Sequence, residues 1–434
     1  MIFLIKIIDL REGKDSDIFE KLASRSQIEY GDVLRRVEDI VGNVKKEGDS
    51  AVIKYTEMFD KVLLKEGELK VTSEEIEEAY REVDQKLLEA IRKSKENIEK
   101  FHQKQKENSW FSTEEDGVIL GQLIRPIEVM GIYVPGGTAA YPSSVLMCAM
   151  PAKVAGVGKI IMSTPPGKDG KVNPVILVTA REAGVDEIYK VGGAQGVAAM
   201  AFGTESIPKV DKIVGPGNIY VATAKRIVYG YCDIDMIAGP SEIMVVADDT
   251  AKPAFVAADL LSQAEHDELA SSVLVTTSEE IAKSVKVEVE KQANRQPRKE
   301  IILKSLESYG AIIIVDNLDS AAKVVNRIAP EHLELCIEEP FSFLGSVKNA
   351  GAIFLGNYST ESLGDYIAGP NHVLPTSGTA RFFSPLNVDD FMKKSSIISY
   401  TKKALEKVKD NVVLFAESEG LKAHADAVRV RFEE

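Results

Sequence analysis

Histidine, cysteine and tryptophan are rare in this chain of 434 residues, which contains five, three and one of them respectively. The cysteines, Cys148, Cys232 and Cys336, are odd in number, lie far apart and form no Cys-x-x-Cys pair. This pattern excludes a disulfide framework and a cysteine-based zinc site, and it is typical of a reducing compartment. We therefore expect a cytoplasmic protein whose thiols are buried.

Excess positive charge and long apolar runs are also missing. The chain has 53 lysines and arginines against 67 aspartates and glutamates, a formal net charge of −14. Nucleic acids and anionic membrane surfaces bind positively charged faces, so the composition argues against both as partners. No run approaches the roughly 20 apolar residues that cross a bilayer. The segment Ile2–Ile8 is short, contains Lys6 and lacks the features of a secretory signal, so we expect a strand or docking segment there.

Apolar residues spaced by three and four predict helices from about Tyr30 to Asn108. One such stripe consists of Val33, Leu34, Val37, Ile40, Val41 and Val44. Thr72 and Glu75 have the spacing of a capping box, and we expect them to open a second long helix that reaches about Lys106. His102 lies on that helix, where an exposed or half-packed side chain is expected.

From Val129 onward, short apolar strands alternate with loops and helices, the pattern of βαβ units on a parallel sheet. The first set has strands over 129–134, 159–162, 187–191, 211–214, 233–237 and 243–247, and helices over 142–157, 174–183, 195–202 and 218–229. The second set has helices over 253–266, 278–292 and 320–328, and strands over 273–276, 312–315 and 352–355. Helices return from about Asp389, with a break at Gly420.

This alternation predicts two Rossmann-like, doubly wound α/β domains, with a short N-terminal segment and a helical C-terminal segment. We expect an N-terminal arm over 1–28 and a nucleotide-binding α/β domain over 135–242. The other α/β domain would combine 29–134, with its long helices, and 243–386. Residues 387–434 would form the helical segment.

Four of the five histidines lie in short runs that also contain Gln, Asp or Glu. Gln263 and His266 are three residues apart on an expected helix, so their side chains share one face and can reach one ion. Histidine is a good zinc ligand, whereas a glutamine carbonyl is a weak one. The alternative is a polar helix C-terminus, where a histidine suits the helix dipole.

Glu331 and His332 follow Pro330, which ends the preceding helix, and we expect both in a loop beside a strand edge. An adjacent acid and imidazole offer two bases of different pKa for two proton transfers. The alternative is the first turn of a short helix.

The stretch Gly356–Gly378 is rich in glycine, proline and polar residues, and it predicts a long functional loop without secondary structure. Asp365 can bring a carboxylate to a metal there, and His372 follows it in the same loop. A solvated surface loop is the competing interpretation. The run Glu419–His424 falls at a helix junction near the C-terminus, where a plain helical surface is the simpler interpretation.

One amide oxygen, one carboxylate and two imidazoles form the candidate metal-ligand set: Gln263, His266, Asp365 and His424. Nitrogen and oxygen donors of this kind suit zinc or a neighbouring divalent ion.

Glycine-bearing loops after expected strands are candidates for holding a nucleotide. Gly215–Asn218 opens a helix, the right context for a pyrophosphate, although Tyr220 replaces the third glycine of the G-x-G-x-x-G motif. Gly192–Gly196 and Tyr133–Gly137 are similar loops. Because ligands of doubly wound sheets bind outside the carboxyl ends of the strands, these loops suit a dinucleotide without demanding one.

With these residues laid out, the chain resembles the histidinol dehydrogenase family over nearly its whole length. The resemblance rests on ordered motifs at Gly131–Gly137, Tyr141–Ser144, Gly192–Gln195, Gly215–Asn218, Gly239–Glu242, Ser262–His266, Pro330–His332, Gly364–Asp365, Asn371–Pro375 and Glu419–His424. One local departure is Asp267-Glu268, where many relatives carry glycine, and it leaves the candidate ligands untouched.

The resemblance implies a homodimeric enzyme that oxidises L-histidinol to L-histidine through an aldehyde, with two NAD and one water, in the last steps of histidine biosynthesis. It implies zinc bound by Gln263, His266, Asp365 and His424, with the last ligand coming from the partner subunit. It implies NAD contacts at Tyr133, Gln195 and Asn218. The implied catalytic residues are Glu331 and His332, and the implied substrate pocket adds Ser241, His372 and Glu419 to the zinc ligands and His332.

Two other functions fit parts of the pattern. A zinc hydrolase would activate water on the metal without a nucleotide, but the chain has no His-Glu-x-x-His segment and has several glycine-bearing loops at strand ends. A non-catalytic metal- or nucleotide-binding protein would not need the adjacent Glu331 and His332.

Overall fold

The computed structural model describes residues 5–12, 17–25, 31–136 and 141–433, which fall into two units. The main unit consists of Met1–Gln105 and Ile127–Phe391, and the small unit consists of Lys106–Pro126 and Met392–Glu434. Ile2–Leu4 and Gly137, which entered the expectations above, lie outside the described residues. Among the described helices, none has the length and apolar character of a membrane span.

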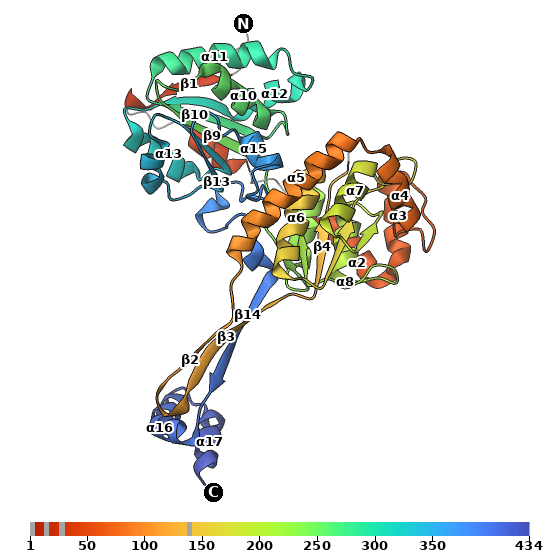
Figure 1. Cartoon of the computed structure of the whole chain (residues 1–434), viewed down its shortest axis with the longest axis vertical. Helices are drawn as coiled ribbons and strands as arrows, with labels where there is room; N and C mark the ends of the chain where they lie inside the picture. The colour runs from red at the N-terminus through yellow and green to blue at the C-terminus, as the bar shows by residue number, and fades with distance from the viewer. Residues whose placement is uncertain (1–4, 13–16, 26–30, 137–140, 434) are drawn as a thin grey trace. The chain divides into compact units, whose positions relative to one another are not determined.

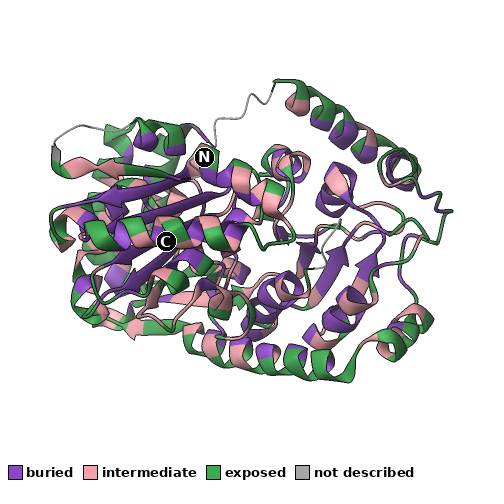
Figure 2. Cartoon of the chain, turned by 90° about the horizontal axis from the view of Figure 1, so that it is seen from above, coloured by how far each residue is buried: buried purple, intermediate pink, exposed green. Residues whose placement is uncertain are grey.

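A parallel sheet of six strands, in the order β1-β11-β10-β9-β12-β13, forms one half of the main unit. Its strands are β1 (Lys6–Asp9), β9 (Glu242–Ala247), β10 (Ser271–Thr276), β11 (Gly310–Ile314), β12 (His332–Cys336) and β13 (Ala352–Leu355). Figure 2 shows its central strands as buried, which explains their continuous Val/Ile runs.

Helices cover both faces of this sheet, because alternate strand residues point to opposite sides. Val245 and Leu274 pack on one face with α10 (Pro253–Ala264), α11 (Glu279–Ala293) and α12 (Lys299–Tyr309). Val246 and Val275 pack on the other face with α1 (Ile18–Ser24) and α13 (Leu318–Ile328). The doubly wound arrangement expected from the sequence is confirmed.

A second parallel sheet has five strands in the order β6-β5-β4-β7-β8. They are β4 (Val129–Tyr133), β5 (Lys159–Ser163), β6 (Glu187–Tyr189), β7 (Lys212–Val214) and β8 (Asp233–Ile234). The connecting helices are α6 (Pro142–Ala155), α7 (Pro174–Ala183), α8 (Gly193–Phe202) and α9 (Ile219–Val228). The chain starts this sheet in the middle at β4, adds β5 and β6 on one side, and then adds β7 and β8 on the other. In the six-stranded sheet, β9 to β13 follow the same order, while β1 lies at the edge beside β11.

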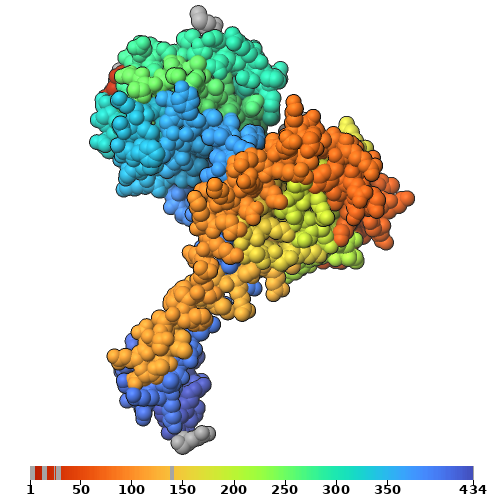
Figure 3. Space-filling model, viewed as in Figure 1, coloured from red at the N-terminus to blue at the C-terminus, as the bar shows by residue number. Residues whose placement is uncertain are grey.

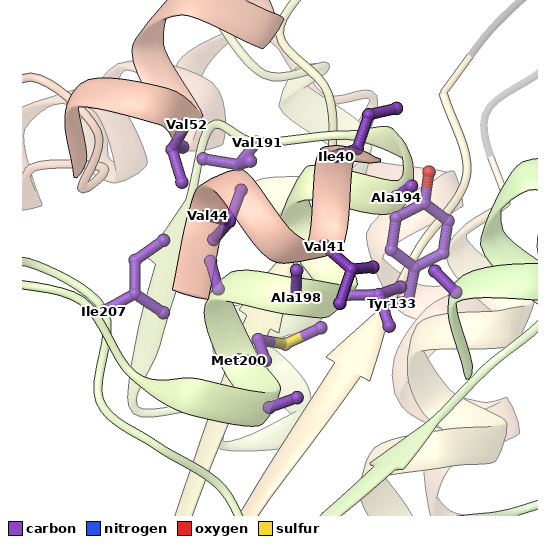
Figure 4. Packing of buried hydrophobic residues seen from close by; sticks show 14 of the residues in the cluster. Ile40, Val41, Val44, Val52, Tyr133, Val191, Ala194, Ala198, Met200 and Ile207 are labelled. Carbon is purple, nitrogen blue, oxygen red and sulfur yellow. The ribbon is translucent and has the colours of Figure 1, made fainter. Parts of the chain in front are cut away.

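The long helices before residue 105 pack on the five-stranded half, which corrects the expected domain division. These helices are α2 (Gly31–Glu47), α3 (Asp49–Asp60), α4 (Ser73–Glu82) and α5 (Gln85–His102). Helix α2 contacts α8 and α9, α4 contacts α7, and α5 contacts α6. Figure 4 shows Val41 and Val44 of α2 beside Ala198 and Met200 of α8. An apolar stripe records that a helix is buried, but not which sheet it covers.

Two further expectations for the N-terminal part are corrected. Residues Lys6–Asp9 are not part of a separate arm, because β1 pairs with β11 at the edge of the six-stranded sheet. The capping box at Thr72 and Glu75 is confirmed, but α4 ends at Glu82 and Asp84 caps a separate helix α5.

His102 is fully buried, not exposed or half-packed. It continues the buried stripe of α5, which runs through Leu88, Ile91, Ser94 and Ile98 at spacings of three and four. Its Nδ1 lies 2.6 Å from the Gln105 side-chain oxygen, and burial lowers its pKa.

The small unit combines an antiparallel sheet with two helices. Its strands are β2 (Trp110–Thr113), β3 (Ile119–Pro126) and β14 (Met392–Ser399), with β3 in the middle (Figure 1). The helices are α16 (Lys402–Ser418) and α17 (Lys422–Arg429), and Gly420 adopts φ 74° at the expected break between them. Figure 3 shows the two chain segments of this unit packed together.

The expectation of helices alone after residue 387 is therefore wrong. The strand β14 pairs with β3 along its whole length, from Met392 beside Pro126 to Ser399 beside Ile119. Most of its side chains are exposed, so it lacks the alternation of apolar and polar residues that identifies a strand. The three cysteines are free and buried, as expected.

Candidate active site

Chemically active side chains gather where three neighbouring strands of the six-stranded sheet begin. These strands are parallel and in register, with Ser271 of β10 beside Glu242 of β9, and His332 of β12 beside Ile243. The active groups are Ser241 before β9, Gln263 and His266 before β10, and Glu331 and His332 at the start of β12. These parallel strands begin at one edge, so residues that are far apart in the sequence, such as Glu242 and His332, meet there.

His332 is buried and held in one tautomer. Its Nδ1 lies 2.9 Å from the Glu242 carbonyl oxygen, which can only accept, so Nδ1 carries the proton. The lone pair is then on Nε2, which is buried and has no hydrogen-bond partner among the described residues. Burial lowers the pKa of His332, against the opposing charge of Asp365. The ring is therefore a neutral base with a free nitrogen.

Glu242 also holds the side chain of Glu331. Its Oε2 accepts a hydrogen bond of 2.9 Å from the Glu242 amide and lies 3.7 Å from His332 Nδ1. Burial raises the pKa of Glu331 well above its usual value, and the Glu242 carboxylate adds to the effect. A carboxyl group with a raised pKa is a stronger base when ionised, which makes Glu331 a candidate for proton transfer.

Asp365 lies in a short helix, α15 (Glu361–Tyr366), inside the stretch expected to lack secondary structure. Asp365, Glu361 and His332 each bring one ligand atom within 4.8 Å of the others. Burial, and then the charge of Asp365, raises the pKa of Glu361 to about 8. Glu361 was missed by the sequence reasoning, although its spacing of four from Asp365 on a helix was a usable signal.

Gln263 and His266 lie at the C-terminal end of α10 and just beyond it. The side-chain oxygen of Gln263 is buried and has no hydrogen-bond partner among the described residues. Burial lowers the pKa of His266, while the charge of Asp365 raises it. A buried, unpaired amide oxygen is costly unless a donor or a cation satisfies it, so this donor set fits a bound metal ion.

His372 connects this cluster to the other half of the main unit. Its Nδ1 lies 3.5 Å from Asp365 Oδ1, and its Nε2 lies 3.4 Å from the Ser144 hydroxyl of α6. The neighbouring Asn371 donates a hydrogen bond of 2.7 Å to the Met147 carbonyl, also in α6. The loop after α15 is therefore held against the five-stranded half.

A cavity of about 1270 Å³ lies at the carboxyl ends of β4, β5 and β7. Tyr133, Gln195 and Asn218, the three expected nucleotide contacts, all line it. Both side-chain amide atoms of Gln195 are buried without a partner among the described residues. The cavity exceeds the roughly 300–1,000 Å³ of most small-molecule sites, which suits an extended ligand.

Asn218 lines this cavity, and Gly215 lies earlier in the same loop after β7. The Asn218 side chain accepts hydrogen bonds from the amides of Tyr220 and Val221 and so caps α9. Gly215 adopts φ 114°, and a Cβ atom there would come within 2.2 Å of the Tyr133 carbonyl oxygen. Only glycine permits this approach.

The structure does not bring every expected site residue into one unit. Ser241, Gln263, His266, Glu331, His332, Asp365 and His372 belong to the main unit. Glu419 and His424 belong to the small unit, where Glu419 ends α16 and His424 lies in the first turn of α17. Glu242, which contacts both Glu331 and His332, was not among the expected residues.

With this geometry in place, comparison with known proteins becomes informative. Residues 23–432 match the family model for histidinol dehydrogenase. The chain belongs to the histidinol dehydrogenase family. It is therefore an oxidoreductase with a small-molecule substrate.

Individual members of the histidinol dehydrogenase family agree closely with this chain. It is 59% identical to histidinol dehydrogenase of Caldanaerobacter subterraneus subsp. tengcongensis, over 99% of both chains. It is 58% identical to that of Clostridium acetobutylicum, again over 99% of both. The crystal structure of histidinol dehydrogenase from Elizabethkingia anophelis matches with a TM-score of 0.94 and 42% identity, covering 100% of this chain and 99% of that one.

Replacing Gly215 tests the close approach of the cavity loops. We expect Gly215→Ala to lower the thermal unfolding midpoint clearly more than Gly230→Ala. Both glycines have positive φ, a strain of roughly 1–2 kcal/mol for alanine, but a Cβ at Gly230 meets nothing within 4 Å. Overpacking adds about 1–3 kcal/mol at Gly215 alone. Equal thermal unfolding midpoints in the two variants, measured by calorimetry, would contradict the steric crowding at Gly215.

Proposed function

We propose that this member of the histidinol dehydrogenase family depends on zinc and NAD, and that it oxidises L-histidinol to L-histidine in two steps through histidinaldehyde. The observation that carries the proposal is the imidazole of His332, whose buried Nε2 has no hydrogen-bond partner among the described residues and whose Nδ1 lies 3.7 Å from the carboxyl group of Glu331. Two proton-transfer groups with oppositely shifted pKa values suit two successive oxidations.

The residues that would hold zinc are Gln263, His266, Asp365 and, from the partner subunit, His424. The unpaired Gln263 oxygen and the clustered ligand atoms around Asp365 support this set. When bound, zinc would act as a Lewis acid that orients the substrate's imidazole and amino nitrogens. Ser241, His372 and Glu419 would complete the substrate pocket.

The residues that would hold NAD are Tyr133, Gln195 and Asn218. Their common position in the wall of one large cavity at the carboxyl ends of the strands supports this assignment. When bound, NAD would supply the hydride acceptor, with one NAD for each oxidation.

In the first oxidation, His332 Nε2 takes the proton of the substrate hydroxyl. The imidazole becomes an imidazolium, which the negative charge of Asp365 stabilises. Because Nδ1 donates to the Glu242 carbonyl, the ring cannot offer the wrong nitrogen. The product of this step is the aldehyde, which remains in the site.

In the second oxidation, Glu331 as a carboxylate takes a proton from water as the water adds to the aldehyde carbon. His332, neutral again, then accepts the hydroxyl proton of the hydrated aldehyde as the second pair of electrons leaves. The product is the carboxylate of L-histidine. Burial of both groups excludes bulk water from these transfers.

We further propose a cytoplasmic homodimer in which His424 and Glu419 complete the partner's site. The small unit supports this proposal because it exposes large apolar side chains that a second subunit would cover. They include Trp110, Phe111, Ile398, Leu414 and Phe415, which are 52%, 59%, 72%, 68% and 72% exposed in the single chain.

Replacing Glu331 tests the division of labour. We expect Glu331→Gln to retain most of the alcohol oxidation and to lose aldehyde oxidation, since glutamine cannot take a proton from water. NADH formation from histidinol and from histidinal, measured separately at 340 nm, reports the two halves. The exposed Glu339→Gln is the matched control. An equal loss in both halves would contradict the assigned role.

Replacing His332 separates base catalysis from metal binding. Asparagine keeps an N–H that can donate to the Glu242 carbonyl but lacks the basic Nε2. We expect His332→Asn to lower kcat by about 10²–10⁴-fold, the usual worth of a general base. Zinc content, measured by elemental analysis, should stay near that of the wild type. If zinc is lost, His332 is a ligand and the proposed set is wrong.

Removing the metal distinguishes the proposal from its rivals. Mixing the protein with histidinol and NAD should increase absorbance at 340 nm, and a chelator should abolish the increase until zinc is restored. A zinc hydrolase or a non-catalytic binding protein would give no increase. An increase that survives complete metal removal would contradict the zinc dependence.

A further inference from the structure

We propose that Glu242, with its carboxylate fixed by Arg25, is a positioning residue that sets the geometry of Glu331 and His332. This inference rests on the proposed roles of those two residues. Glu242 begins β9, in the middle of the six-stranded sheet between β10 and β12.

The main chain of Glu242 contacts both proton-transfer residues. Its amide donates to Glu331 Oε2 at 2.9 Å, and its carbonyl accepts from His332 Nδ1 at 2.9 Å. One peptide segment therefore orients the carboxyl group and selects the imidazole tautomer. A shift of this segment would move both groups together.

The side chain of Glu242 fixes where that segment lies. Its Oε1 accepts hydrogen bonds from the Arg25 guanidinium and, at 2.9 Å, from the Ser377 amide. Ser377 has φ 56°, a strained conformation for a residue other than glycine, which this hydrogen bond helps to hold. The Glu242 Oε1 atom thus joins three residues that lie far apart in the sequence: Arg25, Glu242 and Ser377.

The Arg25–Glu242 ion pair is deeply buried, with side chains 1% and 7% exposed. Breaking a buried pair leaves a charge without compensation, which the structure relieves by moving or by changing protonation. Burial raises the pKa of Glu242, and the Arg25 charge opposes that rise. Without Arg25, the Glu242 carboxylate would take up a proton or move. The start of β9, which carries Glu242, would then be displaced as well.

A purely structural ion pair is the competing explanation. It would contribute to stability, and its loss would reduce activity only as far as the fold is weakened. A positioning residue predicts more, because a displacement of about 1 Å at a catalytic group can cost about 10²-fold in rate. The two explanations therefore predict different kcat values for variants of equal stability.

The test compares variants of Arg25 in the full-length, zinc-loaded enzyme. We expect Arg25→Met to lower kcat with histidinol at least about tenfold, with the KM for NAD and the zinc content unchanged. Arg25→Lys keeps the positive charge and should restore most of the lost kcat. Arg11→Met, which removes an exposed ion pair from the same N-terminal segment, should leave kcat unchanged.

A stability-matched control excludes the structural explanation. Ile302→Ala opens a cavity in the core beneath the same sheet and should lower the unfolding midpoint without lowering kcat of the folded enzyme. If Arg25→Met does not fold, Glu242→Asp decides, because it keeps the charge but retracts the carboxylate by one methylene. We expect that variant to fold and to lose at least about tenfold in kcat.

Three results would overturn the inference. One is a wild-type kcat in Arg25→Met or in Glu242→Asp. Another is a loss of kcat that accompanies loss of zinc, and the third is a loss no larger than that of Ile302→Ala at the same midpoint. A wild-type enzyme that forms no NADH from histidinol would instead defeat the proposed function itself.

Discussion

The parallel register of β9, β10 and β12 is the constraint on which the site depends. These strands begin at one edge, so Ser241, Glu331 and the end of α10 converge although the sequence separates them widely. Glu242 then uses its own amide and carbonyl to hold Glu331 and His332. The backbone of the central strand therefore orients both of the proposed proton-transfer groups.

Burial shifts the pKa values of Glu331 and His332 in opposite directions. The same low-dielectric surroundings raise the pKa of Glu331 and lower that of His332, because each change disfavours the charged form. Burial therefore favours the uncharged form of both groups. The charge of Asp365 opposes the lowering of the His332 pKa.

The two halves of the main unit place their functional groups at opposite ends of their strands. The cavity lined by Tyr133, Gln195 and Asn218 lies at the carboxyl ends of the five-stranded sheet, as the rule for doubly wound sheets predicts. The acid–base cluster lies at the amino edge of the six-stranded sheet. Contacts from the loop after α15 to α5 and α6, such as Asn97 to the Ile367 carbonyl, join the two halves.

The sequence alone determined the local elements and the chemistry of the candidate residues. The helix at Pro174–Ala183 and the Thr72 capping box follow from spacing and end signals, which act between near neighbours. Tertiary structure alone decided which sheet α2 covers, that β14 pairs with β3, and that His102 is buried. It also decided the contacts of Glu361 and Glu242, because these join distant segments of the chain. The spacing of apolar residues shows that one face of a helix or strand is buried. It does not show which other element covers that face.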